Sequence, residues 1–276
     1  MTGIDRPNAR TVTDAHTGTI MSSCLVDIDD SSAVVRLTGT LDVAGTEAVR
    51  GALLARLWDR PGQVVVDVTG LRVVEPRAWD VFAEVRREVA DWPAANLLLC
   101  DPSVDRPEQA TSALAGVSAW STTTAGVPAW PTLDGALAAV AAVPPAGLLS
   151  TDLAATVVAA REARELVTTG CRTWGMPTLV DPAGIAITEM VNNVVAHART
   201  PMTVRLAARD GALHLAVRDY SSRRPTFVGL SPPTRVGGRG LLLIDTVARR
   251  WGSSALPDGK VVWCVLHPDD EAAALG

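Results

Sequence analysis

The sequence lacks the cysteine patterns that stabilise small secreted domains or bind zinc. Its four cysteines are far apart and form no Cys-x-x-Cys pair: Cys24, Cys100, Cys171 and Cys264. This spacing argues against a disulfide framework and against a zinc site, and it fits a reducing cytosol. Cys100 and Cys264 each end an apolar run, so we interpret them as buried structural thiols.

Long apolar runs and an excess of basic charge are also absent. No apolar run reaches the roughly 18 residues of a membrane helix, and the best candidate, residues 136–149, is broken by Pro144-Pro145. Residues 1–22 are polar and contain no apolar core of an export signal. The net charge of −5 argues against a nucleic-acid-binding surface. We therefore expect a cytoplasmic protein that contacts neither membrane nor nucleic acid directly.

The chain of 276 residues is long enough for two ordinary domains, and a proline pair marks a boundary between them. Pro144-Pro145-Ala146-Gly147 stops a preceding Ala-rich helix and stiffens the chain that follows. The predicted segments are a flexible leader (1–22), a first domain (23–143), a linker (144–149), a second domain (150–268) and a tail (269–276).

The first half alternates β-branched runs with helical patterns. Val64–Val68 is a run typical of a strand that is buried on both faces of a sheet. Strands that alternate with helices predict an α/β or α+β fold, a sheet with helices packed on it. We predict strands over 24–28, 33–37, 64–68 and 96–100, and helices over 45–58, 77–91, 108–114 and 134–143.

The second half combines longer helical patterns with a hairpin. The strand predicted over 203–209 turns at Asp210-Gly211 into a second strand over 214–219, which is a strong hairpin signal. We predict helices over 153–174, 182–198 and 241–251, and a last strand over 261–266. These elements predict a layer of helices on a sheet.

The helix predicted over 182–198 carries a polar face. Glu189, Asn193 and His197 follow each other at a spacing of four, which places them near one face. A carboxylate can accept a proton from a nucleophile, and an amide oxygen is a ligand that Mg²⁺ accepts. The spacing alone is more typical of a solvated stripe on an amphipathic helix, and the other features of this segment change that balance.

Two further features point to a nucleotide. Asp219 ends an apolar strand, where its carboxylate can accept a hydrogen bond from the exocyclic amine of a base. Gly237-Gly238-Arg239-Gly240-Leu241 then leads into a helix, where glycines let backbone N–H groups approach phosphate oxygens. A single glycine-rich turn is a weak signal, whereas the ordered combination with Glu189 and Asn193 is specific.

Residues 150–268 resemble the anti-sigma-factor kinases of the GHKL ATPase superfamily. Glu189 to Ala198 is similar to the N-box of that family (E-L-V-x-N-A-x-x-H-A), and Asp219 matches the aspartate that reads adenine. The resemblance implies a Bergerat-type α/β sandwich that binds ATP with Mg²⁺ and phosphorylates Ser or Thr of a protein. It makes Glu189 the catalytic base and Asn193 the Mg²⁺ ligand. The residues that it assigns to ATP are Asn193, Asp219, Gly238, Arg239, Gly240 and Leu241.

The sequence departs from the pattern of that family at two places. Asp219 is followed by Tyr220-Ser221-Ser222-Arg223-Arg224 where the family has glycines. The closing strand, which starts at Gly259, has Val261 where the family commonly has a threonine near the adenine. A catalytically weak or inactive pseudokinase that binds a partner therefore stays the alternative to an active kinase.

The first half resembles a STAS domain, the fold of anti-sigma-factor antagonists. The matching segments are Leu37–Asp42, Val64–Gly70 and Pro131–Leu137. That family has the motif D-S-S-G, which carries the phosphorylated hydroxyl, where this chain has Glu75-Pro76-Arg77-Ala78. We therefore predict a STAS-like domain that is not phosphorylated at this position.

Together the two resemblances imply a regulator of sigma-factor partner switching. The implied partners are a separate STAS-domain antagonist, a sigma factor or both, and a homodimer is compatible with this interpretation. A two-component histidine kinase is disfavoured, because no pair of dimerisation helices with a phosphorylatable histidine precedes the ATPase segment. We interpret His197 as a hydrogen-bonding residue near the helix end.

Overall fold

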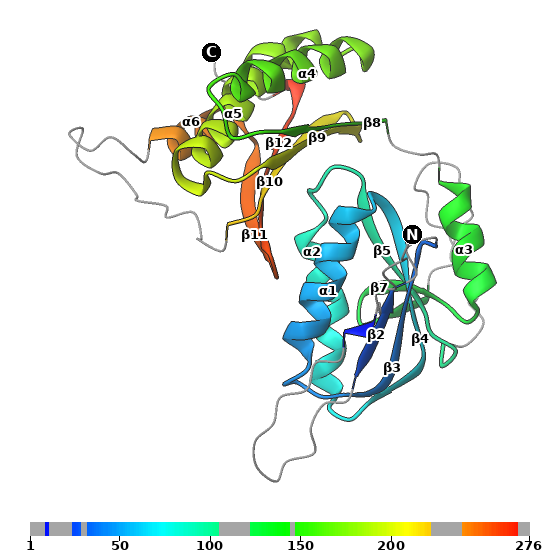
Figure 1. Cartoon of the computed structure of the whole chain (residues 1–276). Helices are drawn as coiled ribbons and strands as arrows, with labels where there is room; N and C mark the ends of the chain where they lie inside the picture. The colour runs from blue at the N-terminus through cyan, green and yellow to red at the C-terminus, as the bar shows by residue number, and fades with distance from the viewer. Residues whose placement is uncertain are drawn as a thin grey trace, which may run out of the picture. The chain divides into compact units, whose positions relative to one another are not determined.

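A computed structural model describes residues 9–10, 24–28, 32–104, 122–143, 147–221 and 239–269 (Figure 1). The chain divides into two compact units. The first comprises Met1–Ala90 and Ala95–Pro145, and the second comprises Asp91–Ala94 and Ala146–Gly276. No helix of the described residues is long and apolar enough to cross a membrane.

The first unit contains a seven-stranded mixed sheet with the strand order β1-β2-β3-β4-β5-β7-β6. The contiguous strands β3, β4, β5 and β7 pair in parallel, and the outer strands pair antiparallel. The strands are β1 (Ala9–Arg10), β2 (Leu25–Ile28), β3 (Val34–Leu41), β4 (Gly62–Val73), β5 (Ala95–Cys100), β6 (Thr122–Thr124) and β7 (Val127–Trp130).

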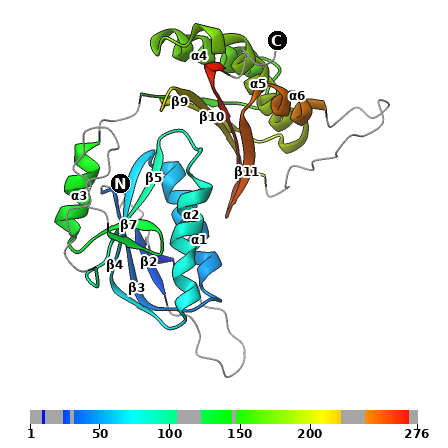
Figure 2. The same cartoon turned by 180° about the vertical axis from the view of Figure 1, so that it is seen from behind.

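Helices cover both faces of this sheet. Helices α1 (Thr46–Asp59) and α2 (Asp80–Glu88) lie side by side on one face, and α3 (Leu133–Ala142) lies on the other (Figures 1 and 2). Helix α3 packs its Ala136 against Val65 of β4. Val64, Val65 and Val66 are all fully buried, which confirms the strand that was predicted to be covered on both faces.

The second unit contains a five-stranded antiparallel sheet with the order β11-β12-β10-β9-β8. Asp210 and Gly211 connect β9 to β10 with φ of 52° and 76°, the left-handed values that a tight hairpin turn requires. The hairpin predicted at this position is confirmed. The strands are β8 (Leu148–Leu153), β9 (Met202–Arg209), β10 (Ala212–Asp219), β11 (Arg250–Leu256) and β12 (Gly259–Leu266).

A helical layer covers one face of this second sheet. It consists of α4 (Ala159–Thr173), α5 (Val180–Asn193) and α6 (Arg239–Val247), as Figures 1 and 2 show. The core between the layers takes alternate residues of the central strands, because successive side chains of a strand point to opposite faces. These residues are Leu213, Leu215 and Val217 of β10, and Cys264 and Leu266 of β12. The resulting helix-on-sheet architecture confirms the predicted mixed α/β class.

Three predicted element boundaries in the second half differ from the structure. Leu148–Leu153 forms the edge strand β8, where a linker and the start of a helix were predicted, and α4 begins only at Ala159. Trp251 lies in strand β11, not in the preceding helix. Strand β8 gains its hydrogen bonds from the distant strand β9, and local sequence does not reveal such pairing, whereas β11 pairs with the adjacent β12 as a hairpin. The helix predicted over 108–114 lies outside the described residues.

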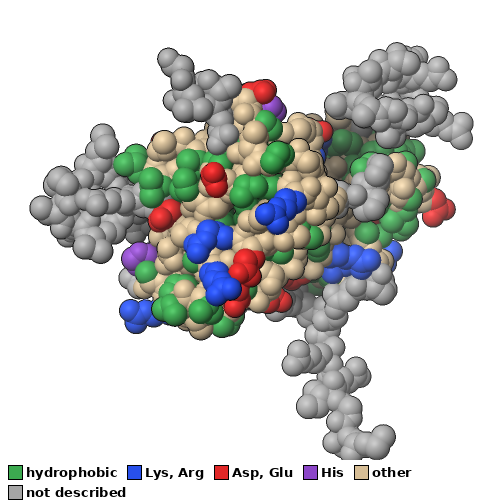
Figure 3. All heavy atoms as spheres, turned by 90° about the horizontal axis from the view of Figure 1, so that it is seen from above, with side chains coloured by type: hydrophobic (Ala, Val, Ile, Leu, Met, Phe, Trp, Pro, Cys, Tyr) green, Lys and Arg blue, Asp and Glu red, His purple; other side chains and the backbone are tan. Residues whose placement is uncertain are grey.

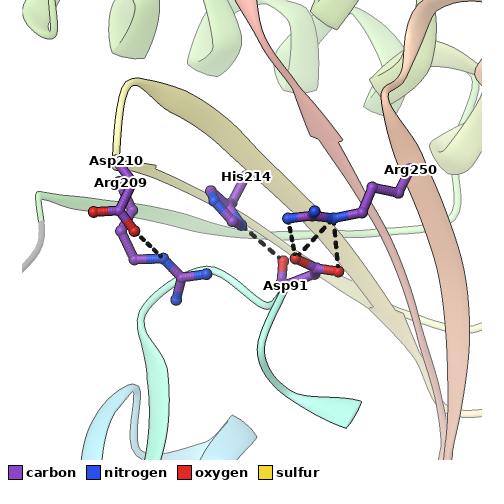
Figure 4. A network of polar contacts seen from close by, with 5 residues as sticks. All are labelled: Asp91, Arg209, Asp210, His214 and Arg250. Atoms are coloured by element: carbon purple, nitrogen blue, oxygen red, sulfur yellow. Dashed lines mark hydrogen bonds and ion pairs between the residues drawn. The ribbon is translucent and has the colours of Figure 1, made fainter. Parts of the chain in front are cut away.

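The short segment Asp91–Ala94 groups with the second unit through contacts of Asp91 (Figure 4). The guanidinium group of Arg250 contacts both carboxylate oxygens of Asp91, with an Nη2–Oδ1 distance of 2.7 Å and an Nε–Oδ2 distance of 3.1 Å. The imidazole Nδ1 of His214 lies 3.0 Å from the carbonyl oxygen of Asp91. His214 is 3% exposed, and this burial lowers the pKa of its imidazole below 6.5.

Candidate functional site

The polar face of α5 brings Glu189 and Asn193 together, one helical turn apart and both half-buried. Neither side chain forms a hydrogen bond or an ion pair with another described residue. The adjacent Thr188, in contrast, donates to the carbonyl oxygen of Gly184 at 2.7 Å and accepts from Arg164 at 3.1 Å. Glu189 and Asn193 therefore keep their oxygen atoms available for a ligand.

The helix changes its winding directly after Asn193. Val194–Ala198 forms a π-helical turn, and Arg199 then ends it in the left-handed conformation with a φ of 58°. A π-helical turn contains more residues than an α-helical turn, so it displaces His197 from the face that an uninterrupted α-helix would give it. His197 is exposed. The predicted row of three is thus a regular pair, Glu189 and Asn193, followed by a histidine on a differently wound turn.

A solvent-open groove of about 950 Å³ runs along the outer side of the helical layer. Helices α4 and α5 form its walls, and Leu243 of α6 contributes at one side. Glu189 lines this groove together with Arg161, Arg164, Glu165 and Arg172. Figure 3 looks down on this face of the molecule and shows arginine and acidic side chains gathered there. Glu189 is therefore reachable from solvent, as a proton acceptor for an external group must be.

Asp219 lies at the end of β10, on the sheet face that the helices cover. It is 2% exposed. Lys260, directly opposite on β12, places its ammonium nitrogen 2.7 Å from Oδ2 and 2.9 Å from Oδ1 of the Asp219 carboxylate. The backbone N–H of Ser221 donates to Oδ1 at 2.9 Å. The carboxylate therefore has a cationic partner within the chain.

The backbone around this ion pair is tightly packed. A Cβ atom at Gly259 would lie 2.0 Å from the carbonyl oxygen of Asp219, so only glycine fits next to Lys260. On the opposite face of the same strands, Arg218 donates to both carboxylate oxygens of Asp258, at 2.9 and 3.0 Å. The Arg218 guanidinium also lies 4.9 Å from the ring centre of Tyr220. These contacts fix the ends of β10 and β12 and hence the position of Asp219.

The structure treats the predicted site residues in different ways. Glu189 and Asn193 are brought together on α5, whereas no hydrogen bond or ion pair among the described residues joins either of them to Asp219. Gly238 lies outside the described residues. Arg239, Gly240 and Leu241 begin α6 in the backbone, as a helix start after the glycines predicts.

Sequence reasoning missed Lys260 as a neighbour of Asp219. The signal that could have found it is the pairing register of β10 with β12, in which Asp219 lies opposite Lys260. That register becomes visible only once β10 and β12 are known to be neighbours.

The oxygen donors of α5 suit a magnesium ion that is carried by a nucleotide. No group of three or more His, Cys, Asp or Glu side chains that could hold a metal occurs among the described residues. Mg²⁺ commonly uses one or two protein oxygens together with phosphate oxygens and water. Glu189 and Asn193, with no other polar partner among described side chains, fit that role.

In the first unit, the segment Glu75–Ala78 shows no comparable set of available polar groups. This segment corresponds to the one that carries the phosphorylated hydroxyl in STAS domains. Glu75 is exposed, and Pro76 begins a single 3₁₀ turn that ends at Trp79. The backbone N–H of Thr69 donates to the Asp67 carboxylate at 3.0 Å. Burial raises the pKa of Asp67, but hydrogen bonds from Thr69 and Arg36 outweigh it and lower the pKa below 3.8.

Residues 153–266 match the family of the histidine kinase-like ATPase domain. The uncharacterized protein SCO4941 of Streptomyces coelicolor is 37% identical over 82 residues, which cover 28% of this chain and 78% of that protein. The assignment of the first unit to the STAS fold stays a prediction from the sequence.

Two solved structures show weaker similarity. One contains the RsbU and RsbW domains of Rv1364c from Mycobacterium tuberculosis, with 21% identity and a TM-score of 0.32, over 45% of this chain and 32% of that one. The other is the histidine kinase domain of the blue-light activated histidine kinase EL346 from Erythrobacter litoralis, with 13% identity and a TM-score of 0.30. It is matched over 42% of this chain and 68% of that one. The present chain thus spans about a third of the length of the mycobacterial structure.

Proposed function

We propose that this chain, which belongs to one family with SCO4941 and carries a histidine kinase-like ATPase domain over residues 153–266, binds Mg·ATP in its second unit. The observation that carries the proposal is the pair Glu189 and Asn193, whose side chains have no other polar partner among described residues. The residues proposed to contact ATP are Asn193, Asp219, Gly238, Arg239, Gly240 and Leu241.

Each residue has a separate task in this proposal. The amide oxygen of Asn193 ligates the magnesium ion, which neutralises phosphate charge when it is bound. The carboxylate of Asp219 accepts a hydrogen bond from the amine of the base. The backbone N–H groups at the start of α6 face phosphate oxygens, which the positive end of the helix dipole favours.

We further propose that the second unit transfers a phosphoryl group to a Ser or Thr hydroxyl of a partner protein. Glu189 accepts the proton of that hydroxyl, and it lines an open groove that a protein segment can enter. A STAS-domain antagonist is the proposed acceptor, and a sigma factor is the proposed alternative partner. The activity as a whole is that of a regulator in partner switching.

A nucleotide-dependent binding module without catalysis is the second candidate. The observation that favours it is the Lys260 ammonium on both oxygens of Asp219, because a base must share that carboxylate with a resident cation. Two departures of the sequence from the family pattern also favour this candidate: Val261 stands where a threonine is common, and Asp219 is not followed by glycines. In this second candidate the chain binds a partner protein, and only the first candidate requires turnover of ATP.

Calorimetry of the full chain with ATP, in Mg²⁺ and in EDTA, tests the metal assignment. We expect Asn193→Ala to remove the gain in affinity that Mg²⁺ gives the parent. Asn192→Ala, on the exposed side of the same helix, is the matched control and should keep that gain. Equal affinity of the parent in Mg²⁺ and in EDTA would contradict the role of Asn193.

A further inference from the structure

The ammonium group of Lys260 shares a buried position with the carboxylate that is proposed to read the base. The side chain of Lys260 is 12% exposed and that of Asp219 is 3% exposed. Both residues point to the face of the sheet that carries Leu215, Val217 and Cys264, which is the face covered by the helices. A base that reaches Asp219 therefore also meets Lys260.

The hydrogen-bonding capacity of the pair is only partly used. Oδ1 of Asp219 accepts from Lys260 and from the Ser221 N–H, whereas Oδ2 lies 2.7 Å from the Lys260 ammonium as part of the ion pair. A carboxylate has about four lone-pair positions, and an ammonium group has three N–H donors. With respect to the described residues, Oδ2 therefore keeps an acceptor position and Lys260 keeps a donor for a ligand.

We infer that Asp219 and Lys260 read the base together and that Lys260 determines specificity, so that the site accepts 6-oxopurine as well as 6-aminopurine nucleotides. This inference rests on the proposed nucleotide site. An acceptor and a donor lie side by side in the pair, at an N–O distance of 2.7 Å. The purine edge likewise presents a donor and an acceptor next to each other.

The two kinds of purine use the pair in opposite order. In a 6-aminopurine, the amine donates to Asp219 and the ring nitrogen N1 accepts from Lys260. In a 6-oxopurine, the oxygen accepts from Lys260 and the N1–H donates to Asp219. A carboxylate without the ammonium would face the 6-oxo oxygen with a second acceptor, which leaves both groups unpaired.

The purely structural alternative is an ion pair that only joins β10 to β12. It would make the same contacts, but its loss would weaken the binding of all nucleotides to a similar extent. The ratio of two affinities that differ only in the 6-substituent separates the two roles. Inosine triphosphate is the suitable probe, because its base differs from adenine only at C6 and N1.

Calorimetry of the parent chain with Mg²⁺ and ATP, inosine triphosphate or pyrophosphate gives the first test. We expect inosine triphosphate to bind within about tenfold of ATP, since neither base leaves a buried group unpaired. A preference for ATP of about a hundredfold or more would overturn this inference while leaving the proposed ATP site in place. Absence of binding of both ATP and pyrophosphate would overturn the site itself and this inference with it.

Substitution of Lys260 gives the second test. We expect Lys260→Met to raise the preference for ATP over inosine triphosphate by about tenfold or more, and Lys260→Arg to keep the parent preference. Asp258→Asn is the matched control, because it disturbs the Arg218 ion pair on the other face of the same strands. An unchanged preference in a folded Lys260→Met chain would overturn the inference. If that chain does not fold, the preference of the parent and of Lys260→Arg decides.

Discussion

The two units differ in how they satisfy their acidic side chains. In the first unit, Asp101 accepts from the Ser103 N–H, the Ser103 hydroxyl and the Thr124 hydroxyl, at 2.9, 2.7 and 2.8 Å. In the second unit, Glu189 has no hydrogen-bonding or ionic partner among described residues and lines an open groove. A carboxylate that is hydrogen-bonded within its own chain stabilises the fold, whereas one beside solvent without a partner among the described residues is free to bind or to accept a proton.

Asp219 takes a position between these two cases. Asp219 is as buried as Asp101, but its carboxylate forms an ion pair with a lysine of the neighbouring strand instead of hydrogen bonds with nearby hydroxyls. Its partner is a lysine ammonium with three N–H donors, so the ion pair can both hold the strands and contact a ligand. The contrast between hydrogen-bonded and available acids therefore predicts which substitutions change chemistry and which change only stability.

The largest effect is expected for Glu189→Gln. If Glu189 is the general base, its loss should slow the transfer of the phosphoryl group from Mg·ATP to an acceptor hydroxyl or to water by about 10²- to 10⁴-fold. The formation of ADP measures this rate, and ATP affinity should be nearly unchanged. The matched control is Glu165→Gln, which lies in the same groove but pairs with Arg161 at 2.9 Å. Equal turnover of the parent and of Glu189→Gln would contradict the role of Glu189 as the proton acceptor.

Asp219→Asn should have the next largest effect, on affinity. Loss of a charge-assisted hydrogen bond to the base costs about 1.5 to 3 kcal/mol, so ATP should bind roughly ten- to a hundredfold more weakly. Pyrophosphate, which has no base, should bind as to the parent. Asp210→Asn, at the far end of β10, serves as the control in the same titrations. ATP affinity equal to that of the parent would show that Asp219 does not read the base.

The pH dependence of stability should differ between the units. Burial holds the pKa of His214 below 6.5, so the unfolded chain binds the proton more readily than the folded one. The contribution of His214 is complete above pH 6.5 and is lost as the pH falls through the lower pKa of the folded state. Asp67 has its pKa below 3.8, so its contribution is complete above that value and is lost only in stronger acid.

We therefore expect the second unit to lose protection of its amide hydrogens at a milder pH than the first. Hydrogen exchange of β10 and of β4, measured from pH 8 to pH 5, checks this order. His214→Gln should flatten the profile of β10, and the control His267→Gln should leave it unchanged. Parallel loss of protection in both strands would contradict the assigned role of His214.

No phosphorylation is expected at the segment of the first unit that corresponds to the phosphorylated segment of STAS domains. Thr69 is the sole hydroxyl residue between positions 69 and 82, and it hydrogen-bonds to Asp67. Incubation of the full chain with radiolabelled ATP, followed by peptide mapping, should find no phosphate there. Stoichiometric label on Thr69 would show that this unit is an acceptor in its own right.

The local sequence predicted those features whose cause lies within a few residues. Asp210-Gly211 predicts the hairpin, because its backbone adopts the left-handed conformation that few other dipeptides adopt readily. The run Val64–Val68 predicts a strand covered on both faces, and the spacing of Glu189 and Asn193 predicts their shared face on α5. In each case the periodicity of the element or the conformation of one residue suffices.

Tertiary structure alone decided the features that depend on pairing between distant segments. Strand β8 forms because β9, which follows α4 and α5 in the chain, offers it a free edge, although its own sequence was compatible with a linker. Lys260 lies 41 positions after Asp219, and only the register of β10 and β12 brings the two charges to 2.7 Å. The sequence by itself determined that Glu189 and Asn193 share a helix face, whereas strand pairing determined which charge lies beside which carboxylate, because hydrogen-bonded register is a property of two segments and not of one.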